Sequence, residues 1–250
     1  MTTNKNWFEN NDFWQTWGPV LFSTQRIANT PTEVDYMLAL VKIPGKAHVL
    51  DLCCGVGRHS LELARRGFKV TGVDRTQVYL IQAEQQAEQE GLKIEFVQED
   101  MRNFCRPDSF DLVINLFTSF GYFEDIEEDR QVARNIHGSL KSGGTLLMDM
   151  SGKEIVARDF REHDWHEVDG VYWLEERKIT GDWDRIWNHW IMFKDGKRFE
   201  NIICPRLYSA VELSTLLRES GFQKLNVYGG FDGSPYDNHA KRLVMVAQKE

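Results

Sequence analysis

Three carboxylates stand at the ends of three short apolar runs, in a spacing that suits ligand binding. Asp51, Asp74 and Asp100 close these runs in turn, and each run is followed by a turn or a helical pattern. Because the carboxyl ends of parallel strands meet at one edge of a sheet, we expect the three side chains to line one site. Asp74 can accept hydrogen bonds from both hydroxyls of a ribose there.

The loop after Asp51 contains Gly55 and Gly57 and leads directly into a helical pattern. Glycines at such a turn let the backbone approach a ligand without a Cβ clash. A dinucleotide site places a pyrophosphate at the N-terminus of this helix, where backbone N–H groups favour anions. The Asp51 carboxylate would repel a pyrophosphate. It suits a cofactor with cationic and hydroxyl groups, such as S-adenosylmethionine.

Five motifs in succession resemble those of class I S-adenosylmethionine-dependent methyltransferases, with small-molecule N-methyltransferase-like bacterial members as the closest resemblance. The resemblance covers about residues 45–150 and implies S-adenosylmethionine as the cofactor. The motifs are Asp51-x-x-Cys54-Gly55-x-Gly57, Gly72-Val73-Asp74, Gln98-Glu99-Asp100-Met101, Phe110-Asp111-Leu112-Val113 and Leu140-Lys141-Ser142-Gly143-Gly144.

The resemblance also implies which residues contact this cofactor. Cys53 stands where the family often has a glycine, which implies a backbone contact. Asp100 would meet the adenine amino group, and the Met101 N–H would reach the ring. Arg26 is the candidate for the carboxylate of the methionine tail. The expected cofactor contacts are Asp51, Cys53, Gly55, Gly57, Asp74, Arg75, Asp100, Met101, Leu116 and Arg26.

The acceptor is expected beside the loop 115–122, which opens at the carboxyl edge of the predicted sheet. This loop lacks the Asn/Asp-Pro-Pro-Tyr signature and resembles that of small-molecule N-methyltransferases, so nitrogen is preferred to oxygen. Tyr122 is the candidate catalytic residue, because it can orient an amine or take its proton through water. The expected acceptor contacts are Thr118, Ser119, Tyr122, Trp187, Tyr208 and Tyr236.

The pattern that must position these residues predicts an α/β fold. Apolar runs alternate with helical stretches over 46–150, which indicates βαβ units and a doubly wound, mostly parallel seven-stranded sheet. The segment 151–207 predicts an antiparallel insertion after the fifth strand, with runs at 171–180, 183–193 and 197–207 and turn signals between them. A helix and a strand pair in 208–250 complete the sheet.

Tryptophans occur in the first part and the later part of the chain and are absent from the segment between them. All eight tryptophans lie outside 18–164. Tryptophans at the periphery of a cofactor domain can form a substrate pocket or a lid, pack a thin ribbon, or form a dimer interface. The N-terminal segment 1–45 is expected to be a lid, with one helix from Trp14 to Asp35.

Composition narrows the class of protein. A formal net charge of -8 argues against a nucleic-acid partner, whose phosphates usually meet a basic face. No apolar stretch reaches the roughly 20 residues that a membrane span needs. None of the four cysteines forms a C-x-x-C pair, so no metal is expected. We expect a cytoplasmic protein with a small-molecule acceptor, and an exposed strand edge allows a homodimer.

Two alternatives use the same residues differently. An NAD(P)-dependent oxidoreductase would need G-x-G-x-x-G, and Ser60 replaces the last glycine or alanine. A non-catalytic cofactor-binding module would use the tryptophan-rich ribbon as a partner interface. The sequence leaves open the acceptor, the number of methyl groups transferred and the use of a general base.

Overall fold

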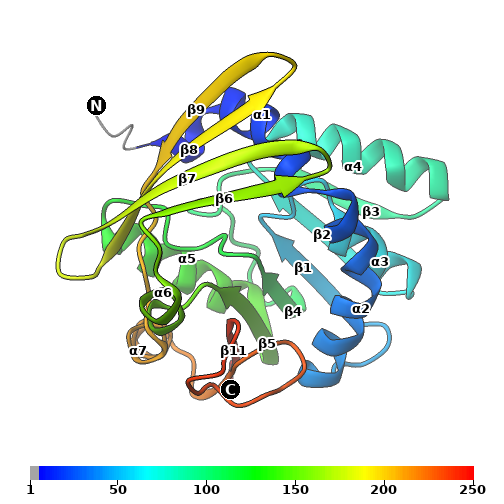
Figure 1. Cartoon of the computed structure of the whole chain (residues 1–250). Coiled ribbons are helices and arrows are strands. Elements are labelled where there is room, and N and C mark those ends of the chain that lie inside the picture. Colours follow the sequence, from blue (N-terminus) through cyan, green and yellow to red (C-terminus); the bar gives the residue numbers. More distant parts are fainter. Residues whose placement is uncertain (1–5) are drawn as a thin grey trace.

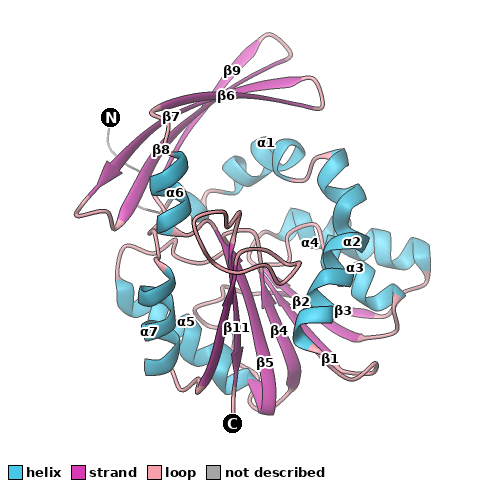
Figure 2. Cartoon of the chain, turned by 60° about the horizontal axis from the view of Figure 1, so that its bottom comes forward, coloured by secondary structure: helices cyan, strands magenta, loops and turns pink. Residues whose placement is uncertain are grey.

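The computed structural model describes residues 6–250 and contains two sheets (Figures 1 and 2). The larger sheet has seven strands in the order β10-β11-β5-β4-β1-β2-β3. Strands β1 to β5 run parallel, whereas β11 pairs antiparallel with β5 and with β10. The predicted fold class, a doubly wound seven-stranded sheet with an antiparallel insertion, is therefore confirmed.

Apolar strands covered on both faces form the core of this sheet. All five residues of β1 are buried, as expected of a central parallel strand, and buried side chains form one cluster on each face. The strands are β1 His48–Leu52, β2 Lys69–Asp74, β3 Ile94–Gln98, β4 Phe110–Asn115, β5 Leu140–Met150, β10 Lys224–Tyr228 and β11 Leu243–Gln248. The covering helices are α3 Arg58–Arg65, α4 Gln77–Glu90, α5 Ile126–Ser139, α6 Lys153–Asp159 and α7 Ala210–Glu219.

The N-terminal segment differs from its prediction. It holds a 3-10 turn, η1 (Trp7–Glu9), and two helices, α1 (Asn11–Leu21) and α2 (Thr24–Val41), in place of one helix. The break falls before Ser23, whose extended backbone and side-chain bond from the Arg26 N–H begin α2. Residues 1–5 of the predicted lid segment lie outside the described residues.

The insertion is a four-stranded antiparallel sheet in the order β6-β7-β8-β9. The prediction lacked β6, whose six residues alternate exposed and half-buried positions without an apolar run, and it also lacked α6. Asp-Gly pairs with positive φ at both positions form the β6–β7 and β8–β9 turns. The strands are β6 His163–Val168, β7 Val171–Thr180, β8 Arg185–Lys194 and β9 Lys197–Ile203.

Tryptophans join this small sheet to the N-terminal segment. Trp173 and Trp190 stack with ring centroids 5.0 Å apart, and both contact Trp17 of α1. Figure 2 shows α1 between the small sheet and the parallel sheet. Helix α1 thus lies between the two sheets, whereas α2 lies beside α3. Among the described helices, none combines the length and the apolar character that a membrane crossing requires.

Candidate active site

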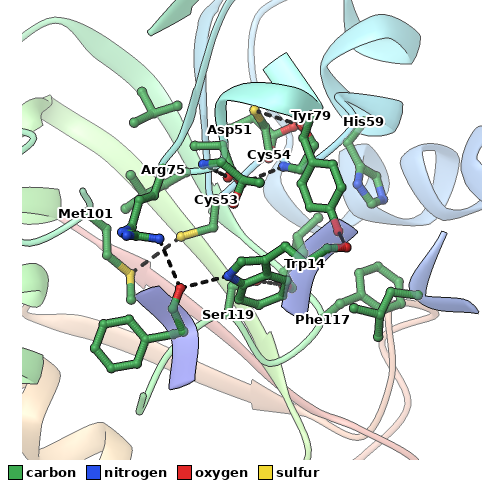
Figure 3. A pocket seen from close by; sticks show the side chains of 18 of the residues that line it. Trp14, Asp51, Cys53, Cys54, His59, Arg75, Tyr79, Met101, Phe117 and Ser119 are labelled. Carbon is green, nitrogen blue, oxygen red and sulfur yellow. Dashed lines mark hydrogen bonds between the residues drawn. The ribbon is translucent and has the colours of Figure 1, made fainter. Parts of the chain in front are cut away.

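A cavity of about 170 Å³ lies where the carboxyl ends of β1, β2 and β3 face η1, α1 and the start of α2 (Figure 3). Side chains from both the parallel sheet and the N-terminal segment close it. The polar lining includes four carboxylates and four potential cations. These residues are Asp51, Asp74, Glu99, Asp100, Arg26, Arg58, His59 and Arg75.

The turn after β1 places its backbone against the cavity. Asp51 is buried and accepts a hydrogen bond from the Ser60 hydroxyl at 2.7 Å, while burial raises the pKa of its carboxyl. Cys53 adopts a left-handed conformation with φ of 66°, which is uncommon for a residue with a side chain. This conformation lets both the Cys53 and the Cys54 N–H groups donate to the Val73 carbonyl.

Asp74 joins this turn to the end of β2. Its two carboxylate oxygens accept from the Gly55 N–H at 2.8 Å and from the Thr76 N–H at 2.7 Å. Burial raises the pKa of Asp74, and these two backbone bonds oppose the shift. Each carboxylate oxygen keeps a further lone pair. Asp74 can therefore support the glycine turn and still accept bonds from a ligand hydroxyl.

Asp100 and Met101 form the wall at the end of β3. The Asp100 carboxylate pairs with Arg102 at 2.7 Å, and Arg102 also reaches Glu9 of η1 at 3.0 Å. Burial would raise the pKa of Asp100, but the bonds from Arg102 hold it below its usual value. The Met101 sulfur lies 3.5 Å from the Cys53 sulfur. This pair gives the wall an apolar part beside the Asp100 charge.

Gly57 does not line the cavity, unlike the other expected cofactor contacts. It caps α3 with φ of 72°, and a Cβ there would lie 2.8 Å from the Ala83 side chain of α4. In this structure Gly57 allows close packing of α3 against α4, and the cofactor contact expected at Gly57 stays a prediction. The expected cofactor contacts that the cavity brings together are Asp51, Cys53, Gly55, Asp74, Arg75, Asp100, Met101, Leu116 and Arg26.

The N-terminal segment covers the cavity and is held by residues of the cofactor-side strands and helices. Arg75, which follows β2, donates to the backbone carbonyl of Glu9 at 2.8 Å and to that of Phe8 at 3.2 Å. The Tyr79 hydroxyl of α4 donates to the Trp14 carbonyl, and the Phe22 ring lies against Gly55. We call η1, α1 and α2 the lid because of these contacts.

Arg26 extends from the lid at the edge of the cavity. Its guanidinium donates to the Leu21 carbonyl at 3.1 Å and makes no ion pair with a carboxylate within residues 6–250. Partial burial, together with the nearby charges of Arg58 and Arg242, lowers its pKa. The lid thus offers an unneutralised cation to an anionic group of a ligand.

The loop after β4 forms the opposite part of the lining. Phe117 and Thr118 both have positive φ, 56° and 63°, and their N–H groups donate to the side chain and the backbone of Asp149. Consecutive left-handed residues with side chains are strained, and such strain concentrates at functional sites. The turn directs Phe117, Ser119 and Tyr122 to the cavity.

Tyr122 lies among aromatic rings of the lid. Its ring centroid is 4.7 Å from that of Trp7 and 6.1 Å from that of Phe8. Burial raises the pKa of Tyr122, and nearby acidic groups add to the shift. The hydroxyl therefore stays protonated at neutral pH, which suits hydrogen bonding to a ligand and excludes action as a phenolate base.

Four expected acceptor contacts, Thr118, Trp187, Tyr208 and Tyr236, do not line the cavity and stay predictions. The Thr118 hydroxyl bonds to Ser151 and Arg242 within the strained turn. Trp187 lies on the small sheet, with the Lys178 ammonium 5.3 Å from its ring. The hydroxyls of Tyr208 and Tyr236 donate to Asp129 at 2.7 Å and to Glu154 at 2.8 Å.

The sequence analysis missed a histidine–carboxylate pair at the cavity. His59 of α3 lines the cavity, and its Nε2 lies 3.0 Å from the Glu33 carboxylate of α2. Burial opposes ionisation of Glu33, but bonds from His59 and Arg58 lower its pKa. The pair depends on the position of α2. The sequence signal that could have revealed the pair is Ser23. Its side chain caps the start of α2, the helix that carries Glu33.

Comparisons with known proteins show similarity to methyltransferases. A family model described as a methyltransferase domain matches residues 49–144. The Bacillus subtilis protein YqeM, provisionally named a methyltransferase, is 28% identical over 217 residues, which are 83% of this chain and 86% of that protein. A glycine/sarcosine N-methyltransferase of Aphanothece halophytica is 26% identical over 226 residues, 89% of this chain and 84% of that protein.

A solved structure shows the same fold over nearly the whole chain. It is that of an S-adenosylmethionine-dependent methyltransferase from Clostridium acetobutylicum, with a TM-score of 0.79. The sequences are 19% identical, and the match covers 96% of this chain and 98% of the other. The fold similarity therefore includes the lid and the small sheet as well as the parallel sheet.

Proposed function

Because the chain is a class I S-adenosylmethionine-dependent methyltransferase, we propose that it methylates the amine nitrogen of a small molecule. One observation carries the small-molecule part of this proposal. Tyr122 and Ser119 line the same cavity as Asp51 and Asp74, beneath residues of the lid. An acceptor that meets the methyl group must therefore enter a cavity covered by the lid, which favours a small molecule over a polymer.

The residues present fit the cofactor. Asp74 offers free lone pairs to ribose hydroxyls, Met101 and Leu116 supply apolar walls, and Asp51 provides a negative charge at the glycine turn. Arg26 is the lid cation that would hold a ligand carboxylate. When bound, S-adenosylmethionine supplies a methyl group on a sulfonium, from which an attacking nitrogen displaces the sulfur in line.

The chain's contribution to methyl transfer is mainly alignment. The Tyr122 hydroxyl, which stays protonated, can accept an N–H bond from an amine and direct its lone pair along the attack line. Two carboxylates at the ends of β1 and β2 favour a cationic amine at the cavity over a neutral alcohol. These two features support nitrogen over oxygen, as does the name of the glycine/sarcosine N-methyltransferase relative.

An amine attacks only after it has lost its proton, and His59 is the residue that we assign to accept it. Its Nε2 faces Glu33, and no protein group bonds to its Nδ1 within the described residues. A ring that donates from Nε2 to a carboxylate keeps its lone pair on Nδ1. His59 can therefore receive a proton directly or through water.

The test uses pairs of small molecules that share a carbon skeleton and differ in one group. Glycine against glycolate, and 2-aminoethanol against ethylene glycol, are incubated with the protein and S-adenosylmethionine. Mass spectrometry then measures S-adenosylhomocysteine and the methylated product. We expect methylation at nitrogen of the amine member only. Methylation at oxygen of the matched alcohol would contradict the nitrogen assignment.

A binding measurement separates the acceptor proposal from the cofactor. Calorimetric titration with S-adenosylhomocysteine, with NAD in parallel, is expected to show micromolar binding of the first and none of the second. Suppose that S-adenosylhomocysteine binds, that no amine of a broader panel is methylated, and that a polymer fraction of a cell extract is methylated. The small-molecule proposal is then wrong. The assignment to the methyltransferase family would stand.

A further inference from the structure

The small sheet has a face that no other described element covers. Figure 2 shows β6 to β9 with α1 on one side and no part of the chain on the other. We call this uncovered side the outer face. Four large apolar side chains on it are exposed: Trp165 by 66%, Phe193 by 51%, Tyr172 by 48% and Leu174 by 39%.

These four side chains form one continuous patch. Strand pairing places Trp165 opposite Leu174, and Tyr172 opposite Phe193. The ring centroids of Trp165 and Tyr172 are 6.3 Å apart. Isolated exposed apolar residues are ordinary, whereas a contiguous patch marks an interaction surface. The exposed Val211 on α7 is an isolated case for comparison.

Charged residues flank the patch in an ordered way. Strand pairing aligns Glu167, Tyr172, Phe193 and Arg198 in one row across β6, β7, β8 and β9. The row therefore starts with an acid at one edge, continues through two aromatic rings and ends with a base at the other edge. Glu167 and Arg198 are both exposed.

We propose that the outer face binds the outer face of a second copy of this chain. In this dimer the two small sheets stack face to face, and the two-fold axis lies midway between them and runs parallel to the strands. This axis places each strand row opposite the same row of the partner, with the order of the strands reversed. Glu167 then faces the partner's Arg198, and Tyr172 faces the partner's Phe193. The row is thus complementary to itself, as a two-fold symmetric interface requires.

Contacts within one subunit do not prevent this pairing. Arg198 lies 3.0 Å from Glu200 of its own strand, and Tyr172 bonds to Glu167. Exposed pairs of this kind contribute little, so their side chains can exchange partners. Sheets that stack face to face lie about 10 Å apart, which leaves room for interleaved aromatic rings.

The size of the face sets the expected affinity. Four strands about 4.8 Å apart, each of six to ten residues, give a projected face of roughly 400–500 Å². A standard stable interface buries about 800 Å² of accessible surface per partner. Because aromatic rings protrude from the face, its accessible area exceeds this projected area but stays below that of a standard stable interface. We therefore expect a dimer with micromolar affinity.

The test measures mass against concentration by sedimentation velocity on the full chain. We expect a monomer–dimer equilibrium, weakened at least tenfold in Phe193→Lys, Glu167→Arg and Arg198→Glu. The double variant Glu167→Arg/Arg198→Glu restores opposite charges across the two-fold axis, so it should dimerise again. Val211→Lys is the matched control for an exposed apolar residue, and it should dimerise as the unmodified chain does.

Three outcomes would overturn the proposal. One is a monomer at all concentrations up to the high micromolar range. Another is a dimer that all three single variants leave intact, which would indicate pairing through the free edge of β6 instead. The third is failure of the double variant to recover, which would reject the two-fold arrangement. Circular dichroism and melting of each variant show that it is folded before its mass is interpreted.

Discussion

At the residue scale, Asp74 performs two tasks with one carboxylate. It fixes the glycine turn through the Gly55 N–H, and it begins the next helix through the Thr76 N–H. Both bonds keep the carboxylate pointed at the cavity. The position that suits a ribose is therefore maintained by the backbone before any ligand arrives, which reduces the ordering that binding requires.

Replacement of Asp74 tests this arrangement. Asp74→Ala should weaken binding of S-adenosylhomocysteine by about 1–3 kcal/mol, because ligand hydroxyls and the Gly55 N–H lose their acceptor. Isothermal titration calorimetry measures the change. The control is Asp111→Ala, since Asp111 pairs with Lys141 at 2.9 Å and lies outside the cavity lining. Equal affinities of Asp74→Ala and the unmodified protein would remove Asp74 from the binding site.

Tyr122→Phe separates orientation of the acceptor from binding of the cofactor. Loss of one hydrogen bond of about 1.4 kcal/mol to the amine should lower turnover roughly tenfold, while affinity for S-adenosylhomocysteine stays unchanged. Steady-state kinetics with an amine that the acceptor test shows to be methylated, together with calorimetry, provide the two readouts.

Tyr208→Phe is the matched control for Tyr122→Phe. Its hydroxyl bonds to the buried Asp129 outside the cavity, so its removal should lower the free energy of unfolding and leave turnover of the folded protein unchanged. An unchanged turnover in Tyr122→Phe would contradict the catalytic assignment of Tyr122.

The sequence predicts the location of single residues where the backbone alone decides that location. Asp51, Asp74 and Asp100 end neighbouring parallel strands, so strand order alone brings them to one edge. The hydrogen bonds of Tyr208 and Tyr236 were not predictable, because an aromatic residue near a loop says nothing about the direction of its hydroxyl. Both hydroxyls instead find carboxylates on α5 and α6.

At the element scale, the buried carboxyl of Asp129 joins α5 to residues 206–208, which precede α7. Asp129 is fully buried, accepts from the Tyr208 hydroxyl and lies 3.4 Å from Arg206. Burial raises the pKa of Asp129 to about 6, although Tyr208 and Arg206 oppose the shift. The helix thus contains a carboxyl whose ionisation disfavours the folded state.

This shift predicts a pH dependence of stability. The pKa of Asp129 in the folded state lies above the unfolded value of 3.8, so the folded state holds the proton more tightly. The resulting contribution to the free energy of unfolding is present at low pH and is lost as the pH rises toward 6. Relative to Asp129→Asn, the unmodified chain should lose up to about 3 kcal/mol of unfolding free energy between pH 4 and 7. Urea denaturation of both chains across this range measures the difference. A difference that does not vary with pH would contradict the raised pKa.

Element boundaries were predictable only where periodic apolar patterns define them. The helices α3, α4 and α5 and the central strands have such patterns, whereas β6 has no apolar run and pairs only with β7. The break between α1 and α2 depends on one cap, Ser23. Propensity alone cannot distinguish that cap from a serine within a longer helix.

At the scale of the whole molecule, the sheet order follows from the strand–helix alternation, but the cover of the cavity does not. The lid reaches its place through bonds from Arg75, Tyr79 and Arg58 to backbone and side-chain groups of the lid. These contacts join segments far apart in the chain. No local pattern marks them, so His59 and Glu33 were found only in the structure.

The distribution of tryptophans gives the molecule a built-in optical reporter. Every indole lies in the lid, the small sheet or the segments beside them, and residues 18–164, which include the first five strands of the parallel sheet, contain none. Intrinsic indole emission therefore reports the lid and the small sheet, whereas far-ultraviolet circular dichroism reports the backbone of both sheets. If the junction separates before the parallel sheet melts, the emission change will precede the dichroic one during denaturation, without any attached dye.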